Sequence, residues 1–362
     1  MISFWVNEEG SFGIHGYRQN RGREIGDRFW TCLYEDIGEV VRCRGGAQIF
    51  SAIDQLTDSQ REAAAMVWDA HTQAAPDAPR LNDPRRVLLR FDLLRTLHDR
   101  GLNNFRVFRP TELHALRRFP VFVRARNDHN GPLTQLLGTR REVLSALCAL
   151  RLRGRRLGDL MIVEFCDTSR TDGIFRKYSA FKIGGSILAC HVLASREWQV
   201  KSEHSEVTDA GIREGMSYVE DNPHESWLRQ VFEIAGVDYG RVDYGVVDGA
   251  PQLWEINLNP TIGRGTWRAR YESLPPDLKQ LRERAREAFH SRLRASFVAL
   301  DRGDDGPEVG VAIDPTLLSR LRADAAENQR RRESLHRLRT LYDSRVLGPP
   351  VRAVYSKLFP RR

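Results

Sequence analysis

Residues 240–260, GRVDYGVVDGAPQLWEINLNP, constrain the fold more than any other part of the sequence. Two runs alternate between apolar and polar residues around the turn residues Asp-Gly-Ala, which predicts an antiparallel β-hairpin. If Val247 pairs with Pro251 across a three-residue loop, the polar face holds two cross-strand pairs, Arg241 with Asn257 and Asp243 with Glu255. The opposite face must meet the core, and it is predicted to hold Val242, Tyr244, Val246, Trp254 and Ile256.

The paired carboxylates of Asp243 and Glu255 predict a metal site. Cross-strand Cβ atoms lie roughly 5 Å apart, so the two charges repel each other unless a cation lies between them. Removal of one carboxylate is therefore expected to leave the stability of the metal-free protein unchanged or raised. Carboxylate and amide oxygens, with Asn257 as a third ligand, suit Mg²⁺ or Mn²⁺ better than zinc, and magnesium is commonly shared with nucleoside triphosphates. The alternative is a hairpin whose polar face simply meets water.

Lysine is rare in this sequence, and its positions are therefore informative. Of 56 Lys and Arg residues only five are lysine, and three of these, Lys177, Lys182 and Lys201, fall within 25 residues. A compact ammonium and a planar guanidinium are not interchangeable at a tight anion site. Either the three lysines serve such a site, or they are ordinary solvated residues of strands and loops.

Length and composition exclude several classes of protein. A chain of 362 residues, 41% apolar and 29% charged, predicts two or three domains, and no run approaches the roughly 18 apolar residues of a membrane span. The start, MISFWVNEEG, lacks the pattern of a secretory signal, so a cytoplasmic protein is expected. Five cysteines without a Cys-x-x-Cys pair argue against a disulfide framework or a structural zinc site.

Periodicity and turn residues predict alternating helices and strands along the chain. Short apolar runs in residues 1–50 predict a small sheet, and a helix is expected over Ser51–His71 with Thr57 or Asp58 as its cap. A second helix is expected to begin at Asp83, with Pro84 in its first turn, and to end at Gly101. Further on, we expect a helix over Arg140–Leu152, strands at Leu160–Phe165, Tyr178–Ile183 and Ser186–Ala194, and helices between Asp209 and Ala235.

The hairpin resembles the last strand pair of the ATP-grasp superfamily, in particular the carboxylate-amine ligases related to D-alanine:D-alanine ligase and glutathione synthetase. That family has an arginine two residues before an aspartate, then a turn, Glu-x-Asn and a nearby proline; the matching residues are Arg241, Asp243, Glu255, Asn257 and Pro260. The resemblance implies that Asp243, Glu255 and Asn257 hold the magnesium that bridges the phosphates of ATP. It also implies that Arg241 stabilises a tetrahedral intermediate formed from an acylphosphate.

Looser matches precede the hairpin in the order that the family has them. FPVFVR followed by HNGP places Arg124 where the family has a phosphate-binding lysine, a substitution that keeps the positive charge. MIVEFCD is similar to the adenine-binding hinge, which implies that Glu164 faces the exocyclic amine and that the backbone around Cys166 reads the base. REWQVKS resembles the segment whose lysine contacts the terminal phosphate, and the corresponding residue is Lys201. NDPRRVLLR resembles a helix with an early phosphate-binding lysine, to which either Arg86 or Arg90 corresponds.

The resulting prediction is an α/β enzyme with α+β lobes: a preceding domain over residues 1–110, ATP-grasp lobes over 111–271 and an arginine-rich helical extension over 272–362. The reaction that the resemblance implies uses ATP to activate a small-molecule carboxylate as an acylphosphate, which an amine or similar nucleophile then attacks. Catalysis would come from Arg241 and Lys201 together with magnesium. Two alternatives stay open: an ATP-dependent phosphotransferase, and a non-catalytic nucleic-acid-binding protein, which the net charge of +8 favours but which leaves the acidic hairpin face unexplained.

The last quarter of the chain carries most of the excess charge, with 19 Lys or Arg and 13 Asp or Glu in residues 272–362, hence 19 − 13 = +6. Leu335, Leu338 and Leu341 follow the cluster Arg330–Arg332 at three-residue spacing, which favours packing against the body of the protein or a second copy in a homodimer. Recruitment of an acidic carrier is the second interpretation, and nucleic acid the least favoured. Truncation after Thr266 is expected to yield an unstable or aggregating protein.

Overall fold

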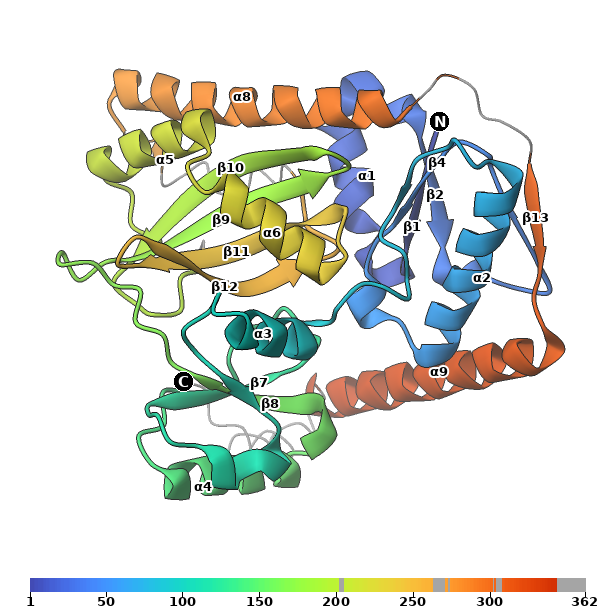
Figure 1. Ribbon diagram of the computed structural model, residues 1–362. Coiled ribbons are helices and arrows are strands. Elements are labelled where there is room, and N and C mark those ends of the chain that lie inside the picture. Colours follow the sequence, from blue (N-terminus) through green and yellow to red (C-terminus); the bar gives the residue numbers. More distant parts are fainter. Residues whose placement is uncertain (202–204, 263–270, 273, 302, 304–307, 344–362) are drawn as a thin grey trace.

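The computed structural model describes residues 1–201, 205–262, 271–272, 274–301, 303 and 308–343 (Figure 1). The N-terminal domain is built on a parallel sheet with the strand order β2-β1-β4-β5, and Figure 1 shows α1 and α2 on either side of it. Its strands include fully buried apolar runs such as ISFWV, as is usual for a parallel sheet covered on both faces. The elements are β1 (Ile2–Val6), α1 (Phe12–Gln19), β2 (Phe29–Leu33), β3 (Val40–Cys43), β4 (Ala47–Phe50), α2 (Asp58–Ala74) and β5 (Arg80–Leu81).

A small lobe follows after α3 (Arg90–Asp99). Helix α4 (Arg140–Leu152) covers its sheet and buries Val143, Leu147 and Leu150 at the spacing of an amphipathic helix. These side chains belong to a hydrophobic core that is separate from the core of the other described parts of the chain. The sheet is antiparallel with the order β6-β8-β7, and its strands are β6 (Val107–Phe108), β7 (Val121–Ala125) and β8 (Leu160–Glu164).

The large lobe contains a four-stranded antiparallel sheet with the order β10-β9-β11-β12. One face, which carries Tyr178 and Tyr244, is covered by helices α5 (Asp209–Asp221) and α6 (Glu225–Ala235). The opposite face carries the polar residues of the predicted hairpin. The strands are β9 (Phe175–Ile183), β10 (Ser186–Ser195), β11 (Tyr239–Val247) and β12 (Ala250–Asn257).

The N-terminal domain and the large lobe share one hydrophobic core and are joined by Asn82. Asn82 is fully buried and has a left-handed backbone (φ 66°), which asparagine tolerates better than most residues. Its side chain donates to the carbonyl oxygens of Phe50 and Tyr239 and accepts from the backbone N–H groups of Asp238 and Tyr239. The parallel sheet is thereby held against β11, so the domain and the large lobe form one packing unit. The small lobe forms a second unit around α4, and Val107, Met161 and Val163 of its sheet also contact the larger core.

The C-terminal extension packs on both parts of the larger unit. Helix α8 (Pro276–Leu300) lies along α5 and β10, and the ring of Phe297 contacts Tyr17, Phe29 and Tyr239 (Figure 1). Strand β13 (Val309–Ala312) then pairs antiparallel with β3, and α9 (Pro315–Asp343) packs on α2. The predicted stripe of Leu335, Leu338 and Leu341, with Arg331 and Arg332, lies outside the residues whose side chains are described.

Most of the predicted elements are present, but two helices begin later than expected. Helix α2 begins at Asp58, because Thr57 accepts a hydrogen bond from Gln60 N and caps the helix there. Helix α3 begins at Arg90 rather than Asp83, and Leu88 N donates to Ala235 O of α6 instead of to a helical partner. Among the described residues, no helix has both the length and the apolar character needed to span a membrane.

Candidate active site

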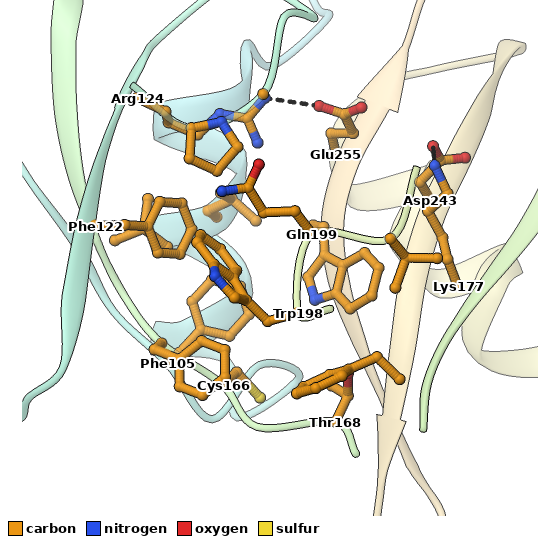
Figure 2. Close-up of a pocket in the computed structure, with 18 of the residues that line it drawn as sticks. Phe105, Phe122, Arg124, Cys166, Thr168, Lys177, Trp198, Gln199, Asp243 and Glu255 are labelled. Atoms are coloured by element: carbon orange, nitrogen blue, oxygen red, sulfur yellow. Dashed lines mark hydrogen bonds and ion pairs between the residues drawn. The ribbon is translucent and has the colours of Figure 1, made fainter. Parts of the chain in front are cut away.

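A cavity of about 480 Å³ lies between the small and large lobes (Figure 2). Its walls come from β7 and β8 on one side and from β9, β11 and β12 on the other. Two loops complete the lining, at residues 129–132 after β7 and 198–201 after β10. The cavity therefore lies where the two packing units meet.

One end of the cavity is aromatic. The rings of Phe122 in β7 and Trp198 in the loop after β10 are 5.0 Å apart between centroids, and Phe165 packs edge-on against Trp198 at 5.8 Å. The loop after β10 thus crosses from the large lobe and packs on the small lobe. Such a surface suits a flat aromatic ring. Other apolar and aromatic residues of the lining include Phe105, Met161, Val163, Phe175 and Trp254.

The other end is ionic, and Asp243 is at its centre. The Asp243 carboxylate accepts hydrogen bonds from Ser179 Oγ (2.8 Å) and Arg241 Nε (3.1 Å), and Lys177 Nζ lies 3.2 Å from its Oδ2. Burial alone would raise the pKa of Asp243, but Arg241 and Lys177 outweigh it and hold this pKa well below its usual range. The carboxylate is therefore ionised at neutral pH.

Glu255 lies opposite Asp243 on β12 and is held by a different pair of cations. Arg90 Nη2 and Arg124 Nη2 both donate to Glu255 Oε2, at 2.7 and 2.9 Å. Figure 2 shows the contact of Arg124 with Glu255. Burial raises the pKa of Glu255, and the two arginines more than offset this, so the pKa is lowered. Within the described residues Glu255 Oε1 has no hydrogen-bond partner, which leaves this oxygen available to a ligand.

The two carboxylates do not face each other as an unbalanced pair, as the sequence suggested. Each is neutralised by two cations of the chain itself, Asp243 by Lys177 and Arg241 and Glu255 by Arg90 and Arg124. This arrangement favours the opposite of the earlier expectation: removal of one carboxylate would leave two cations unpaired instead of relieving repulsion. With Lys201 at the rim, cationic groups outnumber the two carboxylates, and such an excess of positive charge suits a polyanion.

The predicted cross-strand pairs are present, although the loop is shorter than predicted. Asp243 pairs with Glu255 and Arg241 with Asn257, but Val247 pairs with Ala250 across the two-residue turn Asp248-Gly249. A bulge at Trp254 restores the register. The bulge also turns Trp254 away from the core face, where the alternation had placed it, and into the lining of the cavity.

The structure brings several of the other predicted residues to the cavity. Lys201 lies at the rim beside Gly131: a Cβ built on this glycine, which has φ 88°, would be 3.9 Å from Lys201 Nζ. Glu164 and Cys166 line the aromatic end, where Glu164 Oε2 accepts from Arg106 N and Cys166 Sγ donates to Asn104 Oδ1. Burial raises the pKa of the Cys166 thiol to about 11, so it is neutral at pH 7.

The lining of the cavity does not include the predicted residues Arg241, Asn257 and Arg86, or Arg90, the alternative to Arg86. Arg241 nevertheless contacts Asp243, which does line the cavity. Asn257 lies opposite Arg241, and its Oδ1 accepts a hydrogen bond from Asn259 N. Arg86 is exposed, before the start of α3, and its place is taken by Arg90, the alternative in the same segment, which reaches Glu255. The difference follows from the later start of α3, because Arg86 precedes the helix whereas Arg90 is its first residue.

Sequence reasoning missed the contributions of Lys177 and His129. Lys177 could have been found from its scarcity, because it is one of the three lysines within 25 residues. His129 lies in the loop between Arg124 and Pro132, where a lone histidine gives no signal, and its role depends on contacts with residues far away in sequence.

The donor set at the ionic end fits a hard divalent cation. Asp243 and Glu255 are ionised, and the free Oε1 of Glu255 is a hard oxygen ligand. The described residues contain no cluster of three or more His, Cys, Asp or Glu that could hold a metal on its own. A Mg²⁺ ion here would therefore need phosphate oxygens or water to complete its shell.

Comparison with known proteins found solved structures that align with this chain at low sequence identity. No sequence family matches this chain, and no curated protein is detectably similar to it. Among solved structures, D-alanine:D-alanine ligase from Bacillus anthracis is 14% identical over 82% of this chain and 99% of its own, with a TM-score of 0.40. The ATP-grasp ligase PsnB complexed with a minimal precursor is 11% identical over 83% of this chain and 99% of its own, with a TM-score of 0.47. The D-cycloserine synthetase DcsG is 15% identical over 81% of this chain and 99% of its own, with a TM-score of 0.41.

The described residues form an α/β architecture in which a parallel-sheet domain precedes two lobes with antiparallel sheets around one cavity. This is the fold that the resemblance of the hairpin to the ATP-grasp superfamily implies.

Proposed function

We propose that this protein is an ATP-dependent ligase that activates a carboxylate as an acylphosphate and joins it to an amine or similar nucleophile. The observation that carries the proposal is the division of one cavity into an aromatic end and an ionic end, with Asp243 and Glu255 paired across neighbouring strands at the latter. The aromatic end suits a nucleoside base, and the cationic excess at the other end suits its phosphates.

Specific side chains would bind the nucleotide. Lys201 has no ion-pair partner among the described residues, and its compact ammonium at the rim is suited to the terminal phosphate. Arg124 on β7 would donate to the inner phosphates in place of the usual lysine. Glu164 and the backbone near Cys166 border the aromatic end and would contact the base.

The reaction would proceed in two steps. In the first, a carboxylate oxygen of the substrate attacks the γ-phosphorus of ATP, the bond to the β–γ bridging oxygen breaks, and ADP leaves. In the second, the lone pair of the amine attacks the acyl carbon, the carbon–oxygen bond to phosphate breaks, inorganic phosphate leaves and the nitrogen loses a proton. Arg241 Nη1 has no hydrogen-bond partner among the described residues and would donate to the oxyanion of the tetrahedral intermediate.

A divalent cation would complete the site. Asp243 and Glu255 line the cavity and would hold Mg²⁺, or Mn²⁺, which when bound neutralises charge on the phosphates. Asn257 would join them by turning its amide oxygen from Asn259 N towards the cation. Lys177 and Arg241 keep Asp243 ionised, and Arg90 and Arg124 keep Glu255 ionised, so no proton has to be removed before the cation binds.

The test is release of ADP and inorganic phosphate with a panel of amino acids and small carboxylates, followed by mass spectrometry of the products. We expect both ADP and phosphate to depend on magnesium and on a carboxylate, and turnover to be lost in Asp243→Asn, Glu255→Gln and Asn257→Ala. ADP without free phosphate, and a phosphorylated acceptor, would instead identify a phosphotransferase. Wild-type turnover in all three variants would show that the assigned metal ligands are wrong.

A further inference from the structure

A buried carboxylate of the N-terminal domain is connected to the ionic end of the cavity without lining it. Asp54 lies in a short turn (Ile53–Gln55) after β4 and is 9% exposed. Its Oδ2 is 2.9 Å from Nε2 of His129, which lies in the loop of residues 126–132. Asp54 Oδ1 is buried without a hydrogen-bond partner. A buried carboxylate with a hydrogen bond to only one of its oxygens lowers the stability of the fold. If this position served packing alone, an apolar residue would therefore fill it better.

The neighbours of His129 determine which ring nitrogen carries the proton. Arg90 Nη2 lies 3.2 Å from His129 Nδ1, and because a guanidinium can only donate, Nδ1 must accept. The proton of the neutral ring is then on Nε2, which donates to Asp54 Oδ2. Arg90 Nη2 also donates to Glu255 Oε2, so polar contacts run without a break from Asp54 through His129 and Arg90 to Glu255.

Arg90 also holds the backbone of the same loop. Its Nη1 donates to the carbonyl oxygens of Asp128 (2.6 Å) and Arg126 (3.2 Å). The loop therefore extends from the small lobe, while its contacts with Asp54 and Arg90 belong to the other packing unit. Residues 129–132 of the loop line the cavity, and Gly131 lies against Lys201, so the position of the loop affects the whole ionic end.

We propose that Asp54 and His129 are positioning residues for the nucleotide. They hold the loop of residues 126–132 at the ionic end of the cavity, so that Arg90 and Arg124 are already beside Glu255 when the phosphates arrive. Ordering the loop before binding removes an entropic cost from binding itself. The N-terminal domain thus takes part in nucleotide binding through a residue that does not touch the nucleotide. This inference rests on the proposed function, because the ligand is taken to be ATP.

The first measurement is calorimetric titration of the purified full-length protein with ATP and magnesium, compared with kcat and KM. Asp54→Ala and His129→Asn are expected to weaken nucleotide binding roughly tenfold and to raise KM while changing kcat much less. His129→Asn keeps an acceptor near the position of Nδ1 but loses the donor to Asp54. His129→Gln places its amide near Nε2 and keeps that donor, so it should bind nucleotide more tightly than His129→Asn.

A double-mutant cycle and a matched control complete this test. The effects of Asp54→Ala and His129→Asn should not add, because both remove the same hydrogen bond. Asp77→Ala, an exposed aspartate of the same domain, should leave nucleotide affinity unchanged. Additive effects, or equal affinity of the wild type and Asp54→Ala, would overturn the proposal.

The second measurement does not require nucleotide. Hydrogen exchange of the backbone amides in residues 126–132 should be faster in Asp54→Ala than in the wild type, with no comparable change in β11 and β12. If exchange is faster but the wild type binds no ATP, the proposed function fails while the loop contact stands. If Asp54→Ala does not fold, the comparison of His129→Gln with His129→Asn decides, since both change only a loop residue. Equal exchange and equal affinity in these two variants would refute the positioning role.

Discussion

Lys177 and Asp243 lie on neighbouring strands of the large lobe, and the lysine Nζ is 3.2 Å from the carboxylate Oδ2. Removal of the carboxylate charge leaves the partly buried cations of Lys177 and Arg241 unpaired. We therefore expect Asp243→Asn to lower the free energy of unfolding at pH 7 by about 3 kcal/mol. Urea-induced unfolding followed by circular dichroism measures this change.

The control for this prediction is an ion pair in water. Asp69 pairs with Arg85 at the surface, with about half of each side chain exposed, and Asp69→Asn should have no measurable effect. If Asp243→Asn is as stable as the wild type or more so, repulsion between the carboxylates outweighs their pairing with Lys177, Arg241, Arg90 and Arg124.

The pH dependence of stability follows from the same contacts. The pKa values of Asp243 and Glu255 are lower in the folded protein than the ordinary values of about 4 in the unfolded chain. Below about pH 5 the unfolded state therefore binds more protons, and stability should fall as the pH is lowered further toward the folded values. In Asp243→Asn this fall should be less steep. Unfolding midpoints in urea between pH 7 and pH 3 provide the measurement, and parallel curves for the two proteins would contradict it.

The scarcity of lysine leads to a prediction for Lys201. The planar guanidinium cannot replace a point charge against a transferring phosphoryl group, so Lys201→Arg should reduce ATP turnover at least tenfold. Lys279→Arg, at an exposed position of α8, should have no effect. Steady-state kinetics of the two variants provide the test. If both substitutions change ATP turnover equally, the rarity of lysine in this sequence does not identify Lys201 as a residue of the site.

The aromatic end of the cavity predicts a loss of nucleotide affinity in Trp198→Ala. Stacking of a base on an aromatic side chain contributes about 1–3 kcal/mol, so the dissociation constant for ATP should rise at least fivefold. The matched control is Trp30→Ala, because this tryptophan is half exposed on the edge strand β2. Calorimetric titration would show identical affinities for both variants if the base binds elsewhere.

The extension contributes to the core through Phe297. This side chain is fully buried among rings of the N-terminal domain and the large lobe. We expect Phe297→Ala to cost about 4 kcal/mol of stability, and Val298→Ala, a neighbouring and partly exposed position, less than about 1 kcal/mol. Truncation after Thr266 removes the whole helix and should give an aggregating chain. Thermal unfolding with equal midpoints in the two point variants would refute a structural role for α8.

The hairpin shows how far the sequence predicts the site. Alternation correctly paired Asp243 with Glu255, although it assumed a three-residue loop. Asp248 and Gly249 both have positive φ, 49° and 81°, as a tight two-residue turn requires, and the bulge at Trp254 compensates for the missing residue. No local pattern in β12 indicates where the bulge forms. Trp254 was therefore assigned to the wrong face.

The contacts around Glu255 could not be predicted in the same way. Arg90 and Glu255 are 165 residues apart, and their meeting depends on the start of α3, which a backbone bond to α6 determines. Arg86 and Arg90 are equivalent in sequence pattern, and they are distinguished by tertiary contacts: Arg86 is exposed, whereas Arg90 is buried and contacts Glu255. The same holds for Asp54 and His129, which come from two different packing units.

The pairing of β13 with β3 has a consequence for how the chain is made. Strand β3 leaves the ribosome early, but its partner follows roughly 270 residues later, which at bacterial or eukaryotic rates of elongation is a delay of tens of seconds. During that time the edge of β3 carries unsatisfied N–H and C=O groups that other chains can pair with. Nascent chains should therefore depend on chaperones until β13 has emerged, and expression at lower temperature or with excess chaperone should raise the yield of soluble protein.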